Sequence, residues 1–282
     1  MKKIFLLLLV AVFVVACSSV MLTGRRQLSL VSDSEVNEMS FASYKQLIDS
    51  VPLSTDKTNT ALVKKVGSKI AAAVESYMKT NGYESQIANF AWEYNLLKDN
   101  QVNAFCMPGG KVAVYDGILP VTQTETGLAV VIGHEVAHAI AKHSSERLSQ
   151  QLLVQYGAAF AQIAVSQKSA IIQQGVGALY GVGAQVGLLK YSRVQESEAD
   201  KLGLIFMAMA GYDPNQAVPF WQRMAANGSS AVPEFLSTHP SDERRISDIQ
   251  KNLPDALKYY TPVATTTAAK TATTTKTSTV KK

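Results

Sequence analysis

Two histidines and a glutamate form the pattern His134-Glu135-x-x-His138, which lies inside an apolar run from Leu128 to Ala141. A run of this length and composition is typical of a buried helix, and residues four apart lie on the same face of a helix. The two imidazoles can therefore bind one metal ion, for which Zn²⁺ is the natural choice. Glu135 is rotated by about 100° from His134, so it flanks the ion and can accept a proton from water held there.

A third metal ligand is expected from a second pair of residues four apart, Glu196 and Asp200, just before an apolar stretch at 202–210. One carboxylate completes a site of two histidines and one glutamate, and the other accepts the ring N–H of a ligand histidine. We assign Glu196 as the metal ligand and Asp200 as the outer carboxylate. Acidic residues on a helix are more often solvated, and this is our interpretation of Glu198.

The other two histidines lie outside this pattern. His143 follows His134 by nine residues, about 180° around a continuous helix, so it should point away from the metal and be structural or lie next to a ligand. His239 lies in a loop before a helix. It can reach the open metal position or the reaction centre, or it can anchor the loop by a hydrogen bond, and the sequence leaves these alternatives open.

Two pairs with the spacing of a capping box mark where helices begin. Ser32 with Glu35 opens a helix that reaches about residue 48, and Thr122 with Glu125 opens the helix that carries the metal-binding pattern. The second helix is expected to continue past the metal-binding histidines to about Leu148.

A small sheet is predicted just before the metal-binding helix. Residues 90–95 alternate apolar and polar side chains, and a turn at 108–110 precedes a second strand at 111–115. The edge of such a sheet can bind an extended peptide, or the hairpin can serve only to cover the core. With a further helix at about 59–79, the sequence predicts a mostly helical α+β fold with a small β-sheet beside the H-E-x-x-H helix.

The N-terminal residues read as an export signal. Lys2 and Lys3 precede an apolar run that ends at Ala16 and is too short for a comfortable membrane span. The run Val14-Val15-Ala16-Cys17 resembles a bacterial lipobox, which predicts cleavage before Cys17 and acylation of that residue. An ordinary signal peptide with an incidental cysteine is the alternative. We therefore expect a lipoprotein signal peptide at 1–16, a lipid-anchored tether at 17–31, the zinc-binding domain at 32–260 and a disordered Thr/Ala/Lys tail at 261–282.

The charge distribution argues against a nucleic-acid-binding protein, and the cysteine content argues against a protein held together by disulfides. The net charge of +5 arises at the ends, because six lysines lie in residues 1–17 and 261–282; removing these six from the 27 basic residues leaves 21 against 22 acidic ones. The middle of the chain thus gives no charge argument for nucleic acid. If Cys17 is acylated, Cys106 has no disulfide partner and is expected to be a small buried residue.

Residues 152–190 are rich in Ala, Gly and Gln. They predict a helical hairpin or a cover over the active site. A membrane-seeking segment is the alternative, but glutamines and lysines interrupt each candidate span.

Together these residues resemble the HtpX and CAAX-prenyl-protease type of zinc metallopeptidase, a gluzincin, in its soluble periplasmic lipoprotein branch. The resemblance covers roughly residues 24–253. It rests on the H-E-x-x-H pattern, the E-x-x-A-D run that ends at Asp200, and the runs Asn103-Ala104-Phe105, Pro108-Gly109-Gly110 and His239-Pro240…Arg245. It implies a zincin-like fold with one Zn²⁺ per chain bound by His134, His138 and Glu196, and Glu135 as the catalytic base. It also implies that His239 can occupy the fourth zinc position and restrain activity, and that Arg245 lies near the site.

The resemblance further implies an endopeptidase of the bacterial cell envelope that hydrolyses misfolded or misassembled envelope proteins. Ser18 follows Cys17, which favours anchoring at the periplasmic face of the outer membrane. The expected partners are such substrates, the membrane through the lipid anchor, and the outer-membrane assembly machinery. His239 or Arg245 is a candidate for stabilising the oxyanion. A chaperone-like or scaffolding lipoprotein with a non-catalytic zinc ion is the alternative, although structural zinc sites usually have four protein ligands.

Overall fold

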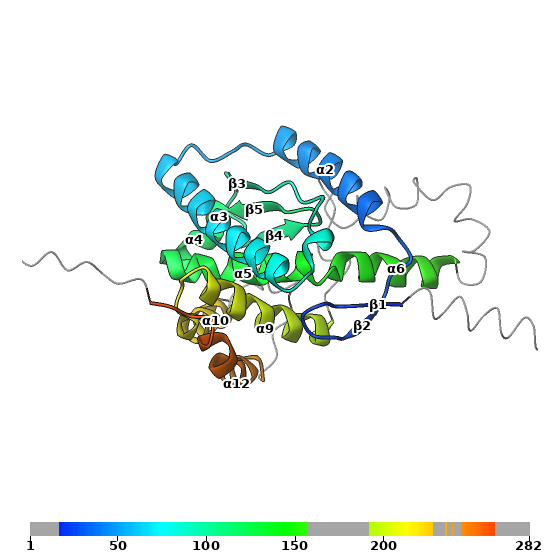
Figure 1. Ribbon diagram of the computed structural model, residues 1–282. Helices are drawn as coiled ribbons and strands as arrows, with labels where there is room; N and C mark the ends of the chain where they lie inside the picture. Colours follow the sequence, from blue (N-terminus) through cyan, green and yellow to red (C-terminus); the bar gives the residue numbers. More distant parts are fainter. Residues whose placement is uncertain (1–16, 157–191, 228–234, 236–238, 240–243, 263–282) are drawn as a thin grey trace, which may run out of the picture.

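The computed structural model describes residues 17–156, 192–227, 235, 239 and 244–262 (Figure 1). The helices of these residues are α2 Asp33–Ser50, α3 Lys57–Thr80, α4 Leu119–Thr122, α5 Glu125–Ile140, α6 His143–Tyr156, α9 Arg193–Met209, α10 Ala217–Asn227 and α12 Arg245–Leu257. The strands are β1 Cys17–Ser19, β2 Arg26–Leu28, β3 Glu93–Leu97, β4 Ala104–Met107 and β5 Lys111–Tyr115, and short 3₁₀ turns lie at Glu84–Gln86, Asp116–Ile118 and Pro214–Gln216. The predicted mostly helical α+β fold is confirmed.

The central sheet has the strand order β3-β5-β4, so β4 is an edge strand. The predicted hairpin at 108–110 joins β4 to β5, and Gly109 and Gly110 adopt φ angles of 80° and 88°, which residues with a Cβ rarely adopt. The strand predicted at 90–95 lies slightly further along the chain as β3, and it runs parallel to β5. The sheet therefore has three strands, whereas the sequence predicts two.

Helices cover both faces of this sheet. Successive residues of a strand point to opposite faces, and Val112 and Val114 of β5 belong to the core that contains α3, α5 and α9. Ala113 and Tyr115 belong to the other core, with α2 and α6. Figure 1 shows α2 on one side of the sheet and α5 on the other. The sheet thus places its edge strand β4 directly against α5, the helix that carries the H-E-x-x-H pattern.

Helix α5 begins at Glu125, directly after a residue that caps its N-terminus. Thr124 is the N-cap and its hydroxyl accepts a hydrogen bond from the N–H of Gly127 at 3.0 Å. The predicted cap, Thr122, is wrong, because Thr122 ends α4 and Gln123 then adopts a φ of 60°. Residues 127–140 are all buried, as expected for a helix that is apolar on every side.

The end of α5 differs from the prediction. The helix ends at Ile140, Lys142 adopts a φ of 58°, and α6 starts at His143, so the predicted continuous helix to Leu148 is wrong. A left-handed conformation costs roughly 1–2 kcal/mol for a residue with a Cβ. The ammonium of Lys142 contacts the Asp33 carboxylate and the Gln86 side chain, and these contacts hold the break in place.

The segment predicted to be a tether forms a β-hairpin. Cys17 lies opposite Leu28 in the β1–β2 pair, and the backbone N–H of Leu30 donates to the Ser149 hydroxyl of α6 at 3.0 Å. Residues 17–31 are therefore packed on the domain. The expected signal peptide at 1–16, most of the hairpin or cover at 152–190 and the tail beyond 262 lie outside the described residues. Within the described ranges, no helix combines the length and hydrophobicity needed to cross a membrane.

Candidate metal centre

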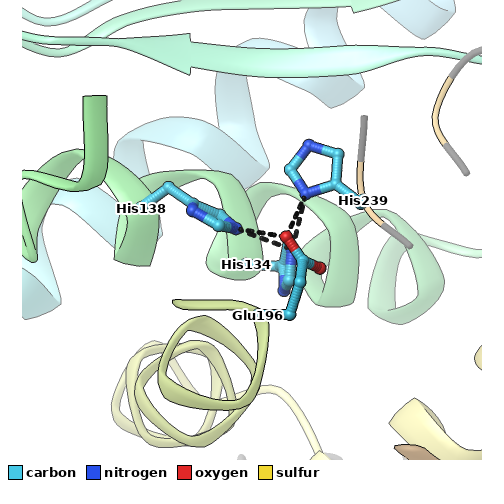
Figure 2. A group of neighbouring side chains, drawn as sticks. All are labelled: His134, His138, Glu196 and His239. Carbon is cyan, nitrogen blue, oxygen red and sulfur yellow. Dashed lines mark hydrogen bonds and ion pairs between the residues drawn. The ribbon is translucent and has the colours of Figure 1, made fainter. Parts of the chain in front are cut away.

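Three parts of the chain bring together four buried side chains that could bind one metal ion (Figure 2). His134 and His138 come from α5, Glu196 comes from the first turn of α9, and His239 precedes α12. One ligand atom of each residue lies within 4.8 Å of all the others. The i and i+4 spacing in α5 places the two Nε2 atoms 3.1 Å apart, and His239 Nδ1 lies 3.2 Å from His134 Nε2.

These distances fit a divalent metal. Zinc ligands at about 2.0–2.1 Å in a tetrahedron lie about 3.3 Å apart. The pairs that join Glu196 to His134, His138 and His239 measure 3.5, 3.4 and 3.0 Å. Glu196 Oε2 is buried, with Arg245 Nη1 at 3.3 Å and His134 Nε2 at 3.5 Å, and the carboxylate can serve as a ligand for a cation. Three imidazoles and one carboxylate are a suitable donor set for such a cation.

Asp200 is the outer carboxylate of His134. Its Oδ1 lies 2.9 Å from His134 Nδ1, so Nδ1 carries the proton and Nε2 offers its lone pair to the cluster. Burial lowers the pKa of His134, but the hydrogen bonds with Asp200 and Glu196 outweigh it and raise that pKa to about 9. The ring is therefore oriented and strongly basic.

Arg245 supports both carboxylates of α9. Its Nη2 donates to Asp200 Oδ1 at 2.7 Å, and its Nη1 lies 3.3 Å from Glu196 Oε2. Its Cζ lies 3.3 Å from the centre of the Trp221 ring, so the guanidinium is held over an aromatic face. These contacts position the ligand carboxylate, and a role of Arg245 in oxyanion stabilisation stays a prediction.

Glu135 lies beside the cluster without joining it. The side chain is buried, its Oε1 lies 3.6 Å from His239 Nε2, and this oxygen accepts no hydrogen bond within the described part of the chain. Burial raises the pKa of Glu135 above its ordinary value, although His239 and His134 act against the rise. A carboxylate with a raised pKa is suited to general-base chemistry near neutral pH.

Two residues next to the cluster differ from the sequence-based interpretation. His143 Nδ1 lies 2.9 Å from His138 Nδ1, because the break at Lys142 turns it toward the ligand. Glu198 was assigned to a solvated face, which is wrong: it is 7% exposed and lies 2.9 Å from His143 Nε2. The N-terminal hairpin covers this face of α9 through Arg25, whose Nε donates to Glu198 at 2.7 Å. No local pattern in the sequence signals that contact.

The structure describes the side chain of one of the two cysteines. Cys106 is a free, buried thiol, as predicted, and burial raises its pKa well above the ordinary value. Cys17 is the first residue of β1, and its acylation stays a prediction.

Comparisons with known proteins agree with this geometry. A model of peptidase family M48 matches residues 64–253. The mitochondrial metalloendopeptidase OMA1 of Schizosaccharomyces pombe is 38% identical over 178 residues, which cover 61% of this chain and 50% of that protein. The OMA1 metalloendopeptidase of Homo sapiens is 28% identical over 250 residues, which cover 84% and 46%. The beta-barrel assembly-enhancing protease of Escherichia coli is 28% identical over 220 residues, which cover 75% and 42%.

This chain thus spans half or less of the length of these three relatives. The resemblance seen in the sequence holds at the level of the family, while the lipoprotein branch stays a prediction. Since the family model extends over the sheet, α5, α9 and Arg245, the chain belongs to peptidase family M48.

Proposed function

We propose that this protein is a zinc-dependent endopeptidase. The observation that carries the proposal is the cluster of His134, His138 and Glu196 with the buried Glu135 beside it. Imidazole and carboxylate donors without a thiolate are typical of catalytic zinc sites. A bound zinc ion supplies a Lewis acid that polarises the scissile carbonyl and lowers the pKa of water. The related OMA1 and beta-barrel assembly-enhancing proteins are named as proteases.

Glu135 is the proposed base. Its carboxylate accepts the proton of the attacking water and returns that proton to the nitrogen of the leaving amine. The pKa of Glu135, raised by burial, suits a group that must both take and give a proton. His239 Nδ1 lies where a fourth ligand would lie, 3.0 Å from Glu196 Oε1. We propose that this arrangement is closed and that His239 withdraws when substrate enters.

The proposed substrate is an extended, unfolded polypeptide that adds to the edge of β4. Unpaired backbone groups at a sheet edge bind extended peptides, and β4 packs on α5 beside the cluster. The backbone N–H of Phe235 donates to the carbonyl of Val102, two residues before β4, at 3.1 Å. The chain near this edge thus already accepts a backbone hydrogen bond from a segment close to His239.

We also propose a location at the bacterial cell envelope, with a lipid anchor on Cys17 at the periplasmic face of the outer membrane. The export-signal pattern and the lipobox-like run 14–17 support this, although several relatives are named as mitochondrial proteins. Misfolded or misassembled envelope proteins are the proposed substrates, and the outer-membrane assembly machinery is a proposed partner. The name of the E. coli relative supports that choice.

Digestion of unfolded casein by the purified full chain tests the activity. The wild type should cleave casein, a chelator should stop the cleavage, and added zinc should restore it. Glu135→Gln should keep its zinc, measured by elemental analysis, and lose cleavage by roughly 10²–10⁴-fold, the usual contribution of a general base. Full activity in Glu135→Gln would refute the role of Glu135. A wild type that binds zinc and suppresses aggregation of casein without cleaving it would favour the non-catalytic alternative.

A further inference from the structure

A row of buried side chains leads from the metal ligand His138 to the N-terminal hairpin. His138 Nδ1 lies 2.9 Å from His143 Nδ1, and His143 Nε2 lies 2.9 Å from Glu198 Oε2. Glu198 in turn accepts hydrogen bonds from Arg25 Nε at 2.7 Å and from the Thr23 hydroxyl. The side chains of His143 and Glu198 are 0% and 5% exposed. Residues from three distant parts of the sequence thus meet behind one ligand.

One placement of the ring protons gives each hydrogen bond in this row a donor and an acceptor. His138 Nε2 faces the cluster, 3.4 Å from Glu196 Oε1, so it must keep its lone pair for the metal and carry its proton on Nδ1. That N–H donates to His143 Nδ1, and the N–H on His143 Nε2 then donates to Glu198. Burial raises the pKa of Glu198, but the hydrogen bonds from His143, Thr23 and Arg25 outweigh it and bring that pKa to about 2.

We propose that His143 and Glu198 are positioning residues for the metal ligand His138, and that Arg25 of the N-terminal hairpin holds Glu198 in place. The two ligand histidines of α5 are then supported differently. His134 donates directly to the carboxylate of Asp200, whereas His138 reaches a carboxylate through a second imidazole. Such outer partners orient a ligand ring and raise its basicity. The inference rests on the proposed zinc site and does not depend on the proposed peptidase activity.

Glu146 offers a matched control. It accepts hydrogen bonds from Arg25 Nη1 and Nη2 at 2.9 and 2.8 Å and from Gln195 Nε2 at 2.7 Å. It is buried to a similar degree, with 5% of its surface exposed. Glu146→Gln therefore removes a buried carboxylate from the same arginine while the Glu198–His143 contact stays in place.

The test measures metal binding by the full chain, with Zn²⁺ titrated against a chromophoric chelator and Co²⁺ used as a spectroscopic probe. Glu198→Gln and His143→Ala should weaken zinc binding by about 10–100-fold and shift the Co²⁺ absorption bands, while Glu146→Gln should stay within about 2-fold of the wild type. His143→Asn should recover part of the loss, because its amide oxygen can accept the N–H of His138. If His143→Ala fails to fold, Glu198→Gln and His143→Asn still decide the question.

Wild-type zinc affinity and unchanged Co²⁺ bands in Glu198→Gln would overturn the inference, as would an equal loss in Glu146→Gln. A wild type that binds zinc but leaves casein intact would contradict the peptidase and leave this inference standing. If the wild type cleaves casein and all variants bind zinc equally well, the proposed peptidase activity stands and the positioning role of His143 and Glu198 is refuted.

Discussion

His239 occupies the fourth position of the cluster, and we proposed that it withdraws when substrate enters. Its ring stacks on Phe235 with 4.6 Å between centroids, and its Nδ1 lies within hydrogen-bond distance of Glu196. Replacing it with alanine opens the fourth position. If the closed form is favoured about tenfold, His239→Ala should raise the initial rate of casein cleavage by up to about tenfold. The rate is compared at equal zinc content, and a lower rate with zinc retained would show that His239 assists the reaction.

Cys106 gives a second prediction for a single residue, and it tests Cys17 as well. The thiolate is the reactive form, and the Cys106 thiol is 3% exposed with a pKa raised by burial. In protein isolated from bacterial membranes, Ellman's reagent at pH 8 should therefore detect almost no thiol in the folded chain. Denaturation should release one thiol per chain, and none in Cys106→Ala. Release of two would show that Cys17 carries no acyl group.

The sequence predicts the inner residues of the site better than the outer ones. His134, His138 and Glu135 are related by the geometry of one helical turn, so their spacing alone places them around one point. Glu198 and His143 depend on contacts made by residues far away in the chain. The break that redirects His143 is held by Asp33 and Gln86, and local periodicity contains no information about either.

At the scale of elements, the site depends on close packing between α5 and α9. A Cβ added to Gly203 would lie 2.9 Å from the backbone N of His134, and one added to Gly133 would lie 3.0 Å from the carbonyl oxygen of Gly203. The two backbones therefore approach closely next to the ligands. This approach sets the distance from Glu196 on α9 to the histidines on α5.

Gly203→Ala should separate these helices. Alanine favours an isolated helix by about 1 kcal/mol, but overpacking against backbone atoms costs about 1–3 kcal/mol. We expect the free energy of unfolding of the zinc-free chain, measured with urea, to fall by about 1 kcal/mol, the difference between these effects. Zinc affinity should fall as well, because Glu196 moves with α9. Lys201→Ala, at an exposed position of α9, is the control. A stabilised variant with unchanged zinc affinity would contradict the proposed packing.

The bounds of helices and strands are predicted well where neighbouring residues set them, and poorly where contacts with distant residues set them. The helices predicted from 32 and at 59–79 appear as Asp33–Ser50 and Lys57–Thr80, because the capping box at Ser32 and the apolar period of the second helix are local signals. The parallel pairing of β3 with β5 joins two strands that are separated in the chain by β4, so the composition of the strands does not reveal it. The β1–β2 hairpin was missed because short strands with few apolar residues resemble a linker.

At the scale of the whole molecule, zinc is expected to join parts of the chain that would otherwise separate. Its proposed ligands come from α5, from α9 and from the segment before α12. A ligand that binds only the folded chain stabilises it by RT ln(1 + [L]/Kd), about 4 kcal/mol at a thousandfold excess over Kd. For a domain of this size that corresponds to a rise in Tm of about 10 °C. EDTA should lower the Tm of the wild type by this amount, and zinc should restore it, while His138→Ala should respond little.

The size of this shift should depend on pH in a defined direction. Protons compete with zinc for imidazole nitrogens, and the pKa of His134 is raised to about 9 before metal binds. At pH 7 zinc must therefore displace a proton, so its apparent affinity falls by about tenfold for each unit of pH below 9. That is about 1.4 kcal/mol of lost stabilisation per unit. The difference in Tm between zinc-loaded and EDTA-treated protein should shrink steadily from pH 9 to pH 6. A difference that stays constant over this range would mean that His134 binds the metal without losing a proton, and the raised pKa of His134 would then be wrong.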